Sequence, residues 1–382
     1  MKVLLVSDAG SIHTKRWASS LKDAGVDIVL FSITPADEGF YSQKDIRLYV
    51  FDLFSYKNRK DRGGKKKVIP LFAPLAAHAD AVRLLKKVLQ EEKPDILHAH
   101  YATSYGLVAA LSGYHPFVLS VWGSDVYEFP EQSFVNRTAV KYMLGKADRV
   151  LSTSRAMAVR TSLYYKGDIG ITPFGVDIAR FRKELPAVAD NRRIVFGTVK
   201  TLSQKYGIDL LIRAFARMRL IMSEKYGSEA PETVLEIAGK GPDRRTLGQL
   251  ASDLGVAANV DFLGEVGHDS VPDLYSGMDV AVFLSRSESF GVSAVEAMSC
   301  SVPVIASDAA GFMEVLEDGA GVIVPCGDVE SAAEAMARLA TDAGERMSLA
   351  VKGRRRVEER YDWKKNVETM IKEYGNVLLH KD

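Results

Sequence analysis

Cysteine is scarce in this chain, and long apolar runs are missing from its sequence. The two cysteines, Cys300 and Cys326, show no CxxC spacing and have no histidine cluster beside them, which excludes a disulfide framework and a structural zinc site. No apolar run approaches the roughly 20 residues that cross a bilayer. The opening MKVLLVSDAG turns polar at Ser7, too early for the core of a signal peptide. We therefore expect a cytoplasmic globular protein.

Length and charge favour two domains. A chain of 382 residues exceeds what one core usually fills, so two domains of roughly 150 to 200 residues are expected. The net charge of +1 hides an asymmetry, because residues 1–185 carry 27 Lys/Arg and 19 Asp/Glu, whereas residues 186–382 carry 23 and 30. The two halves are therefore expected to face different partners.

Short apolar segments alternate with amphipathic ones in both halves. This pattern predicts an α/β fold of two doubly wound domains, each with a parallel sheet covered by helices on both faces. In the first half the expected strands are 3–6, 27–31, 46–50, 96–99, 116–121 and 149–152. In the second half they are 194–198, 234–238, 260–263, 280–284, 303–306 and 322–324, and helices are expected over 208–222, 243–254 and 290–300. The polar, aperiodic stretch 183–193, KELPAVADNRR, is interpreted as the linker.

A basic run, KNRKDRGGKKK, extends from Lys57 to Lys67 and holds seven basic residues and one acid. It is the distinctive feature among the loops of the first half. It could contact an anionic membrane surface or a phosphorylated acceptor, and a merely solvated loop is an equal alternative.

The segment SESFGVSAVEAMSCSVPVIASDAAG, residues 287–311, carries the strongest indication of a ligand site. It follows an apolar strand, and Phe290, Gly291 and Val292 supply the first amides of the next expected helix. Free N–H groups at the positive end of a helix favour a phosphate, and a glycine lets a bulky anion approach the backbone.

Two carboxylates, Glu288 and Glu296, flank these amides. They would repel a diphosphate, but they accept hydrogen bonds from sugar hydroxyls. Glu296 lies about two turns into the helix, roughly 10 Å beyond the amides, so the two acids suit the two ends of a nucleotide-sugar. In the alternative interpretation, Glu288 caps the helix or complements its dipole and Glu296 is a surface residue.

Other expected strands of the second half also end in suitable residues. Lys200 and Lys205 follow the first strand and could neutralise a diphosphate leaving group, although loop lysines are more often solvated. Gly239 and Gly241 follow the next strand and would leave room for a flat base, on which Arg244 could stack. The second half is therefore expected to bind the donor.

Three strand ends of the first half are polar: DAGS at 8–11, HAHY at 98–101 and WGSD at 122–125. We expect them to converge at one edge of the sheet, because ligands bind beyond the carboxyl ends of parallel strands. His100 is a candidate for chemistry because of its place at a strand end, whereas His98, two residues earlier on the same face, is the candidate for a structural role.

These motifs, in this order, resemble the family 4 glycosyltransferases, also called glycosyl transferases group 1, which have the GT-B fold. The resemblance runs from DAGSIHTKRW through HAHYATSYG, WGSD, KYGIDLLIRAF, AGKGP and FLGEV to the ExxxxxxxE spacing of Glu288 and Glu296. It implies two Rossmann-like domains facing across a cleft: an acceptor-binding domain over 1–185 and a donor-binding domain over 186–360. A C-terminal helix within 361–382 would return to the first domain.

The resemblance also implies transfer of a hexose-type sugar, with retention of configuration, from a nucleotide-sugar (UDP-linked rather than GDP-linked) to a saccharide or lipid-linked acceptor, in polysaccharide or glycolipid synthesis. No nucleic acid is among the expected partners. The expected catalytic residues are His100, Lys200, Lys205 and Glu288. The expected donor-binding residues are Gly10, Ser11, Thr198, Gly239, Gly241, Arg244, Phe262, Leu263, Phe290, Gly291, Val292 and Glu296. Trp122 and Asp125 are candidates for the acceptor side.

The sequence departs from the family pattern at Thr198, which follows Gly197 where the family commonly has arginine, and Lys200 could take over that role. No DxD pair occurs in the sequence, so neither a metal nor a cofactor is expected. Two alternatives stay open: a nucleotide-sugar epimerase or hydrolase of the same fold, and a non-catalytic subunit that binds nucleotide-sugar.

Overall fold

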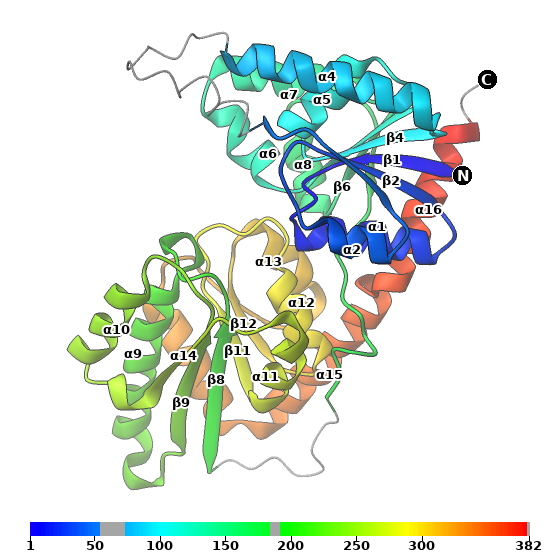
Figure 1. The fold of residues 1–382 in the computed structure, drawn as a ribbon. Coiled ribbons are helices and arrows are strands. Elements are labelled where there is room, and N and C mark those ends of the chain that lie inside the picture. Colours follow the sequence, from blue (N-terminus) through cyan, green and yellow to red (C-terminus); the bar gives the residue numbers. More distant parts are fainter. Residues whose placement is uncertain (54–72, 184–191, 380–382) are drawn as a thin grey trace. The chain divides into compact units, whose positions relative to one another are not determined.

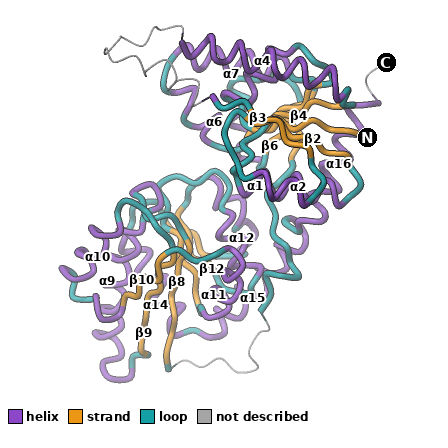
Figure 2. Tube along the Cα trace, in the orientation of Figure 1, coloured by secondary structure: helices purple, strands orange, loops and turns teal. Residues whose placement is uncertain are grey.

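The computed structural model describes residues 1–53, 73–183 and 192–379 (Figure 1). They form two compact units: a first unit of residues 1–173 and 365–382, and a second unit of residues 174–364. In each unit the strands lie at the centre with helices around them (Figure 2). The basic run from Lys57 to Lys67 and the centre of the expected linker lie outside the described residues.

The first unit contains a seven-stranded sheet with the order β3-β2-β1-β4-β5-β6-β7, in which all neighbours pair in parallel. The strands are β1 (Lys2–Val6), β2 (Asp27–Ser32), β3 (Arg47–Val50), β4 (Ile96–His100), β5 (Phe117–Val121), β6 (Arg149–Ser152) and β7 (Ile169–Ile171). The helices are α1 (Ile12–Asp23), α2 (Glu38–Gln43), α4 (Ala73–Glu92), α5 (Ser104–Ser112), α6 (Ser124–Tyr127), α7 (Phe134–Lys146), α8 (Arg155–Thr161) and, from Lys365 on, α16 (Trp363–Leu379). Strands β4 and β5 are buried along their whole length, as expected for a sheet covered on both faces.

The second unit contains a six-stranded parallel sheet with the order β10-β9-β8-β11-β12-β13. Its strands are β8 (Arg193–Val199), β9 (Glu232–Ala238), β10 (Val260–Gly264), β11 (Val280–Phe283), β12 (Val304–Ser307) and β13 (Val322–Val324). Its helices are α9 (Ile208–Tyr226), α10 (Arg244–Asp253), α11 (Val271–Gly277), α12 (Val292–Ser299), α13 (Ala310–Val315), α14 (Val329–Thr341) and α15 (Ala343–Arg360). Helices α9 and α14 carry apolar faces that pack into one core with β8 and β9.

The strand order reverses between β1 and β4 in the first sheet and between β8 and β11 in the second. Connections after neighbouring strands diverge at such a point, which leaves a crevice beyond the carboxyl ends. The loops that follow β1, β4, β8 and β11 are therefore the places where each unit can build a site.

The sequence predicted a boundary at 185–186, and in the structure the chain passes between the units at 173–174 and again at 364–365. Residues after 173 already bond within the second unit. The amide of Val176 donates to the carbonyl of Tyr361 at 2.8 Å, and the carbonyl of Val176 accepts from the amide of Trp363 at 3.0 Å. The carbonyl of Phe181 accepts from Ser299 Oγ at 2.8 Å. These bonds hold the segment on the second unit.

Candidate active site

A lysine and a glutamate form a close ion pair at the switch point of the second sheet. Lys200 directly follows β8, Glu288 lies beyond β11, and Lys200 Nζ is 2.7 Å from Glu288 Oε2. Both side chains are 11% exposed, and Lys200 Nζ also lies 4.7 Å from the centroid of the Tyr206 ring. The sequence suggested separate partners for these two charges, whereas in the structure each orients the other.

Helix α12 begins beside this pair. Gly291 is its N-cap, with a φ of 100°, and a Cβ there would lie 2.8 Å from the Phe312 ring, so a larger residue does not fit this turn. Phe290 is 3% exposed, and its ring packs edge-on against Phe174 and Tyr361. Its side chain thus belongs to the core, and the group it offers a ligand is its backbone amide. The first amides of a helix have no partner within the helix, so they point outward from this turn.

Glu296 is buried along the same helix, with 8% exposure. Its negative charge adds to burial in raising the pKa of Tyr275 well above 10, and burial followed by the same charge raises the pKa of Cys300 to about 12. The alternative that Glu296 is a surface residue is therefore wrong. A carboxylate kept in a buried position is costly unless polar partners surround it.

The loop after β9 packs directly on the loop after β8. A Cβ on Gly239 would lie 1.9 Å from the Lys200 carbonyl oxygen, and one on Gly241 would lie 2.2 Å from that of Leu202. Three backbone hydrogen bonds join the loops: from the Lys200 amide to Ala238, from the Leu202 amide to Lys240, and from the Asp243 amide to Leu202. The glycines were expected to make room for a base. In the structure they make room for the backbone that carries Lys200.

The remaining expected residues of the second unit differ in their surroundings. The guanidinium of Arg244 lies 3.8 Å from the centroid of the Phe262 ring, so it already stacks on an aromatic side chain. Leu263 is 43% exposed, and Lys205 is exposed in the loop after β8. Thr198 is 1% exposed, and its Oγ1 has no hydrogen-bond partner among the described residues.

In the first unit, His100 is buried at the end of β4, with 1% exposure. Its Nδ1 lies 3.1 Å from Ser7 Oγ, which lies 2.7 Å from Thr14 Oγ1. The ring is stacked against Trp122, with centroids 4.4 Å apart and a 31° tilt. Burial, with repulsion from His98 as a smaller cause, holds the pKa of His100 well below 6.5. The imidazole is therefore neutral near pH 7 and can accept or donate a hydrogen bond.

His98 has both ring nitrogens in hydrogen bonds, from Nδ1 to the Tyr374 hydroxyl at 2.7 Å and from Nε2 to Ser120 Oγ at 2.8 Å. Burial lowers the pKa of His98 to about 3. The structural role expected for this histidine agrees with these contacts.

Asp125 was expected on the acceptor side, and the structure buries its side chain. The residue is 0% exposed, and its carboxylate accepts hydrogen bonds from the amides of Ala102, Trp122 and Gly123 at 2.7 to 3.2 Å. Burial raises its pKa, and these bonds oppose the rise. Asp125 therefore holds the loops after β4 and β5 together.

Gly10 and Ser11 lead into α1. The amide of Gly10 donates to Asp8 Oδ1 at 3.0 Å, and Ser11 is the N-cap of the helix without a side-chain cap hydrogen bond. Sequence patterns did not indicate three residues that surround the two histidines: Ser7, Thr14 and Tyr374. The place of Ser7 at the end of a strand could have indicated the first of them, but the other two lie on helices and become neighbours only in the fold.

Within residues 1–53, 73–183 and 192–379, no group of three or more His, Cys, Asp or Glu side chains could hold a metal ion. No helix in these ranges is both long enough and apolar enough to span a membrane.

Comparison with known families shows what the chain resembles. The model of "Glycosyl transferases group 1" matches residues 180–356, and that of "Glycosyl transferase 4-like" matches residues 2–154. These matches confirm the resemblance to the group 1 glycosyl transferases that the motifs predicted. The D-inositol 3-phosphate glycosyltransferase of Salinispora arenicola is 30% identical over 260 residues, which cover 62% of this chain and 56% of that protein. The chain thus matches little more than half of this relative's length.

Solved structures show the same fold. Sucrose-phosphate synthase from Thermosynechococcus elongatus superposes with a TM-score of 0.78 and 20% identity, over 99% of both chains. Anabaena HepE, in complex with UDP and glucose, superposes with a TM-score of 0.74 and 21% identity, over 98% of this chain and 100% of that one. The expected GT-B fold of two Rossmann-like domains is confirmed.

Proposed function

We propose that this protein is a retaining glycosyltransferase. It moves a hexose-type sugar from a nucleotide-sugar, UDP-linked rather than GDP-linked, to a saccharide or lipid-linked acceptor in cell-surface polysaccharide or glycolipid synthesis. The observation that carries the proposal is the Lys200–Glu288 pair beside the first turn of α12, with Glu296 buried along the same helix. The match to the group 1 glycosyl transferases supports it, and the UDP bound to HepE supports the choice of donor.

In this proposal the candidate residues of the second unit bind different parts of the donor. The amides of Phe290, Gly291 and Val292 bind the diphosphate, because the start of a helix favours anions. Glu288 accepts hydrogen bonds from the sugar hydroxyls, and Glu296 accepts them from the ribose. The base lies against the backbone near Phe262 and Leu263, and the buried hydroxyl of Thr198 belongs to the same donor site.

Departure of the nucleoside diphosphate develops negative charge. In this proposal Lys200 and Lys205 stabilise that charge together with the start of α12, so the reaction needs no metal ion. Because Glu288 pairs with Lys200, the donor sugar and the leaving group are recognised by two ends of one ion pair.

The first unit contributes His100, which bonds the transferred sugar in its neutral form. Gly10 and Ser11 lie in the loop that meets the diphosphate and acceptor, and Trp122 lines the acceptor side next to His100. We propose no covalent nucleophile.

Calorimetric titration with UDP-, GDP- and ADP-sugars, each with Mg²⁺ and with EDTA, tests the proposal. We expect a UDP-sugar to bind most tightly and equally well in both buffers. Glu296→Gln should weaken UDP binding roughly tenfold, since a hydrogen bond to a charged group contributes about 1.5 kcal/mol or more. Glu265→Gln is the matched control, because Glu265 is an exposed carboxylate of the same unit paired with Lys240. If no nucleotide-sugar binds, the proposal is wrong.

Product analysis separates transfer from the rival activities. NMR of the product should show the anomeric configuration of the donor, and release of free sugar should not exceed transfer once an acceptor is present. Inversion of configuration would exclude the retaining mechanism while leaving the donor site intact.

A further inference from the structure

Helix α16 brings a tyrosine to the histidine pair of the first unit. Tyr374 is 0% exposed, and its hydroxyl lies 2.7 Å from Nδ1 of His98, a residue 276 positions earlier. The two rings meet edge to face, with centroids 5.5 Å apart. On the other side of the imidazole, Nε2 lies 2.8 Å from Ser120 Oγ on β5. His98 is therefore held between a helix and a strand.

Burial determines where the protons lie. The lowered pKa of His98 makes the ring neutral, so it carries one N–H. The Tyr374 hydroxyl is removed from water, and His98 is its hydrogen-bond partner among the described residues. A buried donor left without an acceptor is destabilising. The hydroxyl therefore donates to Nδ1, and the ring proton lies on Nε2, which donates to Ser120.

The ring of His98 in turn supports His100. Their centroids are 4.5 Å apart with an interplanar angle of 89°, so the two rings are perpendicular. Trp122 contacts His100 at 4.4 Å, and Ser7 bonds its Nδ1. Rotation of the His98 ring would change one of the surfaces that hold His100 in place.

We propose that Tyr374 is a positioning residue for His100: its hydroxyl fixes the tautomer and ring plane of His98, and His98 fixes the ring of His100. The consequence for turnover rests on the proposed function, in which His100 bonds the transferred sugar. The effect of Tyr374 on the rings of His98 and His100 does not depend on the proposed function.

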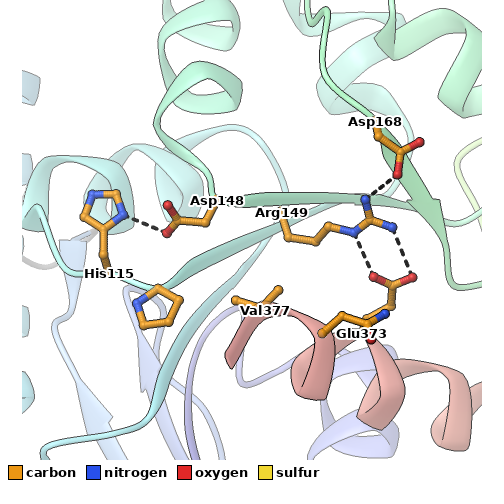
Figure 3. Close-up of a pocket in the computed structure, with 8 residues that line it drawn as sticks. His115, Asp148, Arg149, Asp168, Glu373 and Val377 are labelled. Carbon is orange, nitrogen blue, oxygen red and sulfur yellow. Dashed lines mark hydrogen bonds and ion pairs between the residues drawn. The ribbon is translucent and has the colours of Figure 1, made fainter. Parts of the chain in front are cut away.

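The residue next to Tyr374 provides a matched control. Glu373 bonds the guanidinium of Arg149 on β6 through both carboxylate oxygens, at 2.7 and 3.1 Å, and lines a cavity of about 790 Å³ with His115, Asp148 and Asp168 (Figure 3). Glu373 and Tyr374 thus anchor the same helical turn to different partners. Glu373→Gln weakens the helix contact without touching His98.

NMR of the full chain labelled with ¹⁵N-histidine tests the structural part. In the wild type we expect the His98 resonances of a ring protonated at Nε2. Tyr374→Phe should shift the Nδ1 resonance of His98 and also the resonances of His100, whereas Glu373→Gln should leave both unchanged. Unchanged His100 resonances in Tyr374→Phe, or equal changes in Glu373→Gln, would overturn the proposal. If Tyr374→Phe does not fold, Ser120→Ala removes the other anchor of the ring, and the same shift of His100 is expected.

Kinetics test the consequence for turnover. Tyr374→Phe should lower kcat roughly fivefold, the rate equivalent of about 1 kcal/mol, with the KM for the donor unchanged. Glu373→Gln should leave kcat unchanged. If the NMR shifts occur and kcat does not fall, His100 is positioned by Tyr374 but does not act in transfer. If the wild type transfers no sugar, the NMR result still decides whether Tyr374 positions His100.

Discussion

The two units stabilise the polar groups at their strand ends in different ways. In the first unit His98 and His100 are almost completely buried, and each is held by hydrogen bonds to nearby hydroxyls. In the second unit Lys200 and Glu288 keep opposite charges at 11% exposure, on loops packed backbone against backbone. A neutral, hydrogen-bonded group is fixed in place at little electrostatic cost, whereas a paired charge remains available to a charged ligand. The first arrangement favours orientation, and the second favours recognition of an anion.

Acidification should produce the largest difference in stability between the two units. Since the pKa of His98 is about 3 in the folded chain and 6.5 is its ordinary value, the unfolded chain binds more protons between these limits. The contribution of His98 to the free energy of unfolding is therefore fully present above pH 6.5. It is lost as the pH drops toward 3, with a loss of about 2 kcal/mol at pH 5. His100 adds a loss of the same sign. Hydrogen exchange at pH 7 and pH 5 should show β4 and β5 losing more protection than β8 and β9, and equal losses would contradict the comparison.

Replacement of Gly207 should have the next largest effect, a loss of stability of the second unit. Gly207 has a φ of +65°, and a Cβ there would lie 1.8 Å from the Leu284 carbonyl oxygen. Gly207→Ala should cost about 3 kcal/mol, since it adds overlap with the backbone to conformational strain. Gly255→Ala is the control, with a φ of +70° and no heavy atom within 4 Å, and should cost about 1 kcal/mol. Urea unfolding measures both, and equal costs would show that backbone packing at this edge is unimportant.

The Lys200–Glu288 ion pair should contribute less to the stability of the second unit than the backbone packing at Gly207. Lys200→Met and Glu288→Gln should each destabilise the second unit by about 2 kcal/mol, because each leaves a largely buried charge without its partner. The double variant should cost less than the sum of the single variants. Chemical unfolding of the three variants gives the coupling energy, and strictly additive costs would show that the pair is not coupled.

An exposed pair at the same edge should have the smallest effect. Lys240 Nζ lies 2.7 Å from Glu265, but the side chains are 74% and 61% exposed. Lys240→Ala should therefore change the stability by less than about 0.5 kcal/mol. A cost as large as that of Lys200→Met would mean that burial does not distinguish the two pairs.

Much of the fold follows from local pattern. Twelve strands were expected, and each occurs within a few residues of its expected place, because an apolar run between turn residues signals a buried strand. Strand β7 was missed, since three residues, Ile169–Ile171, are too few for a period to show. Helix α12 begins at Val292 rather than Phe290, because Gly291 has a left-handed conformation that its letter alone does not reveal.

The sequence predicted less of the candidate site than of the fold. Residue types at strand ends pointed to Lys200, Glu288 and His100 as candidates. Their partners could not be predicted, because Lys200 meets Glu288 across 88 positions and His98 meets Tyr374 across 276. Such pairings depend on which strands become neighbours and where a distant helix packs. The complete burial of Asp125 was missed for the same reason.

The discontinuity of the first unit has a consequence for biosynthesis. Residues 1–173 leave the ribosome before the second unit, and residues 365–382 leave after it. Domains generally fold as their residues emerge, so the second unit has all of its residues while the first still lacks Tyr374. Until that helix arrives, His98 has no phenol to hold its Nδ1. The first unit, whose synthesis begins before that of the second unit, is therefore completed after it.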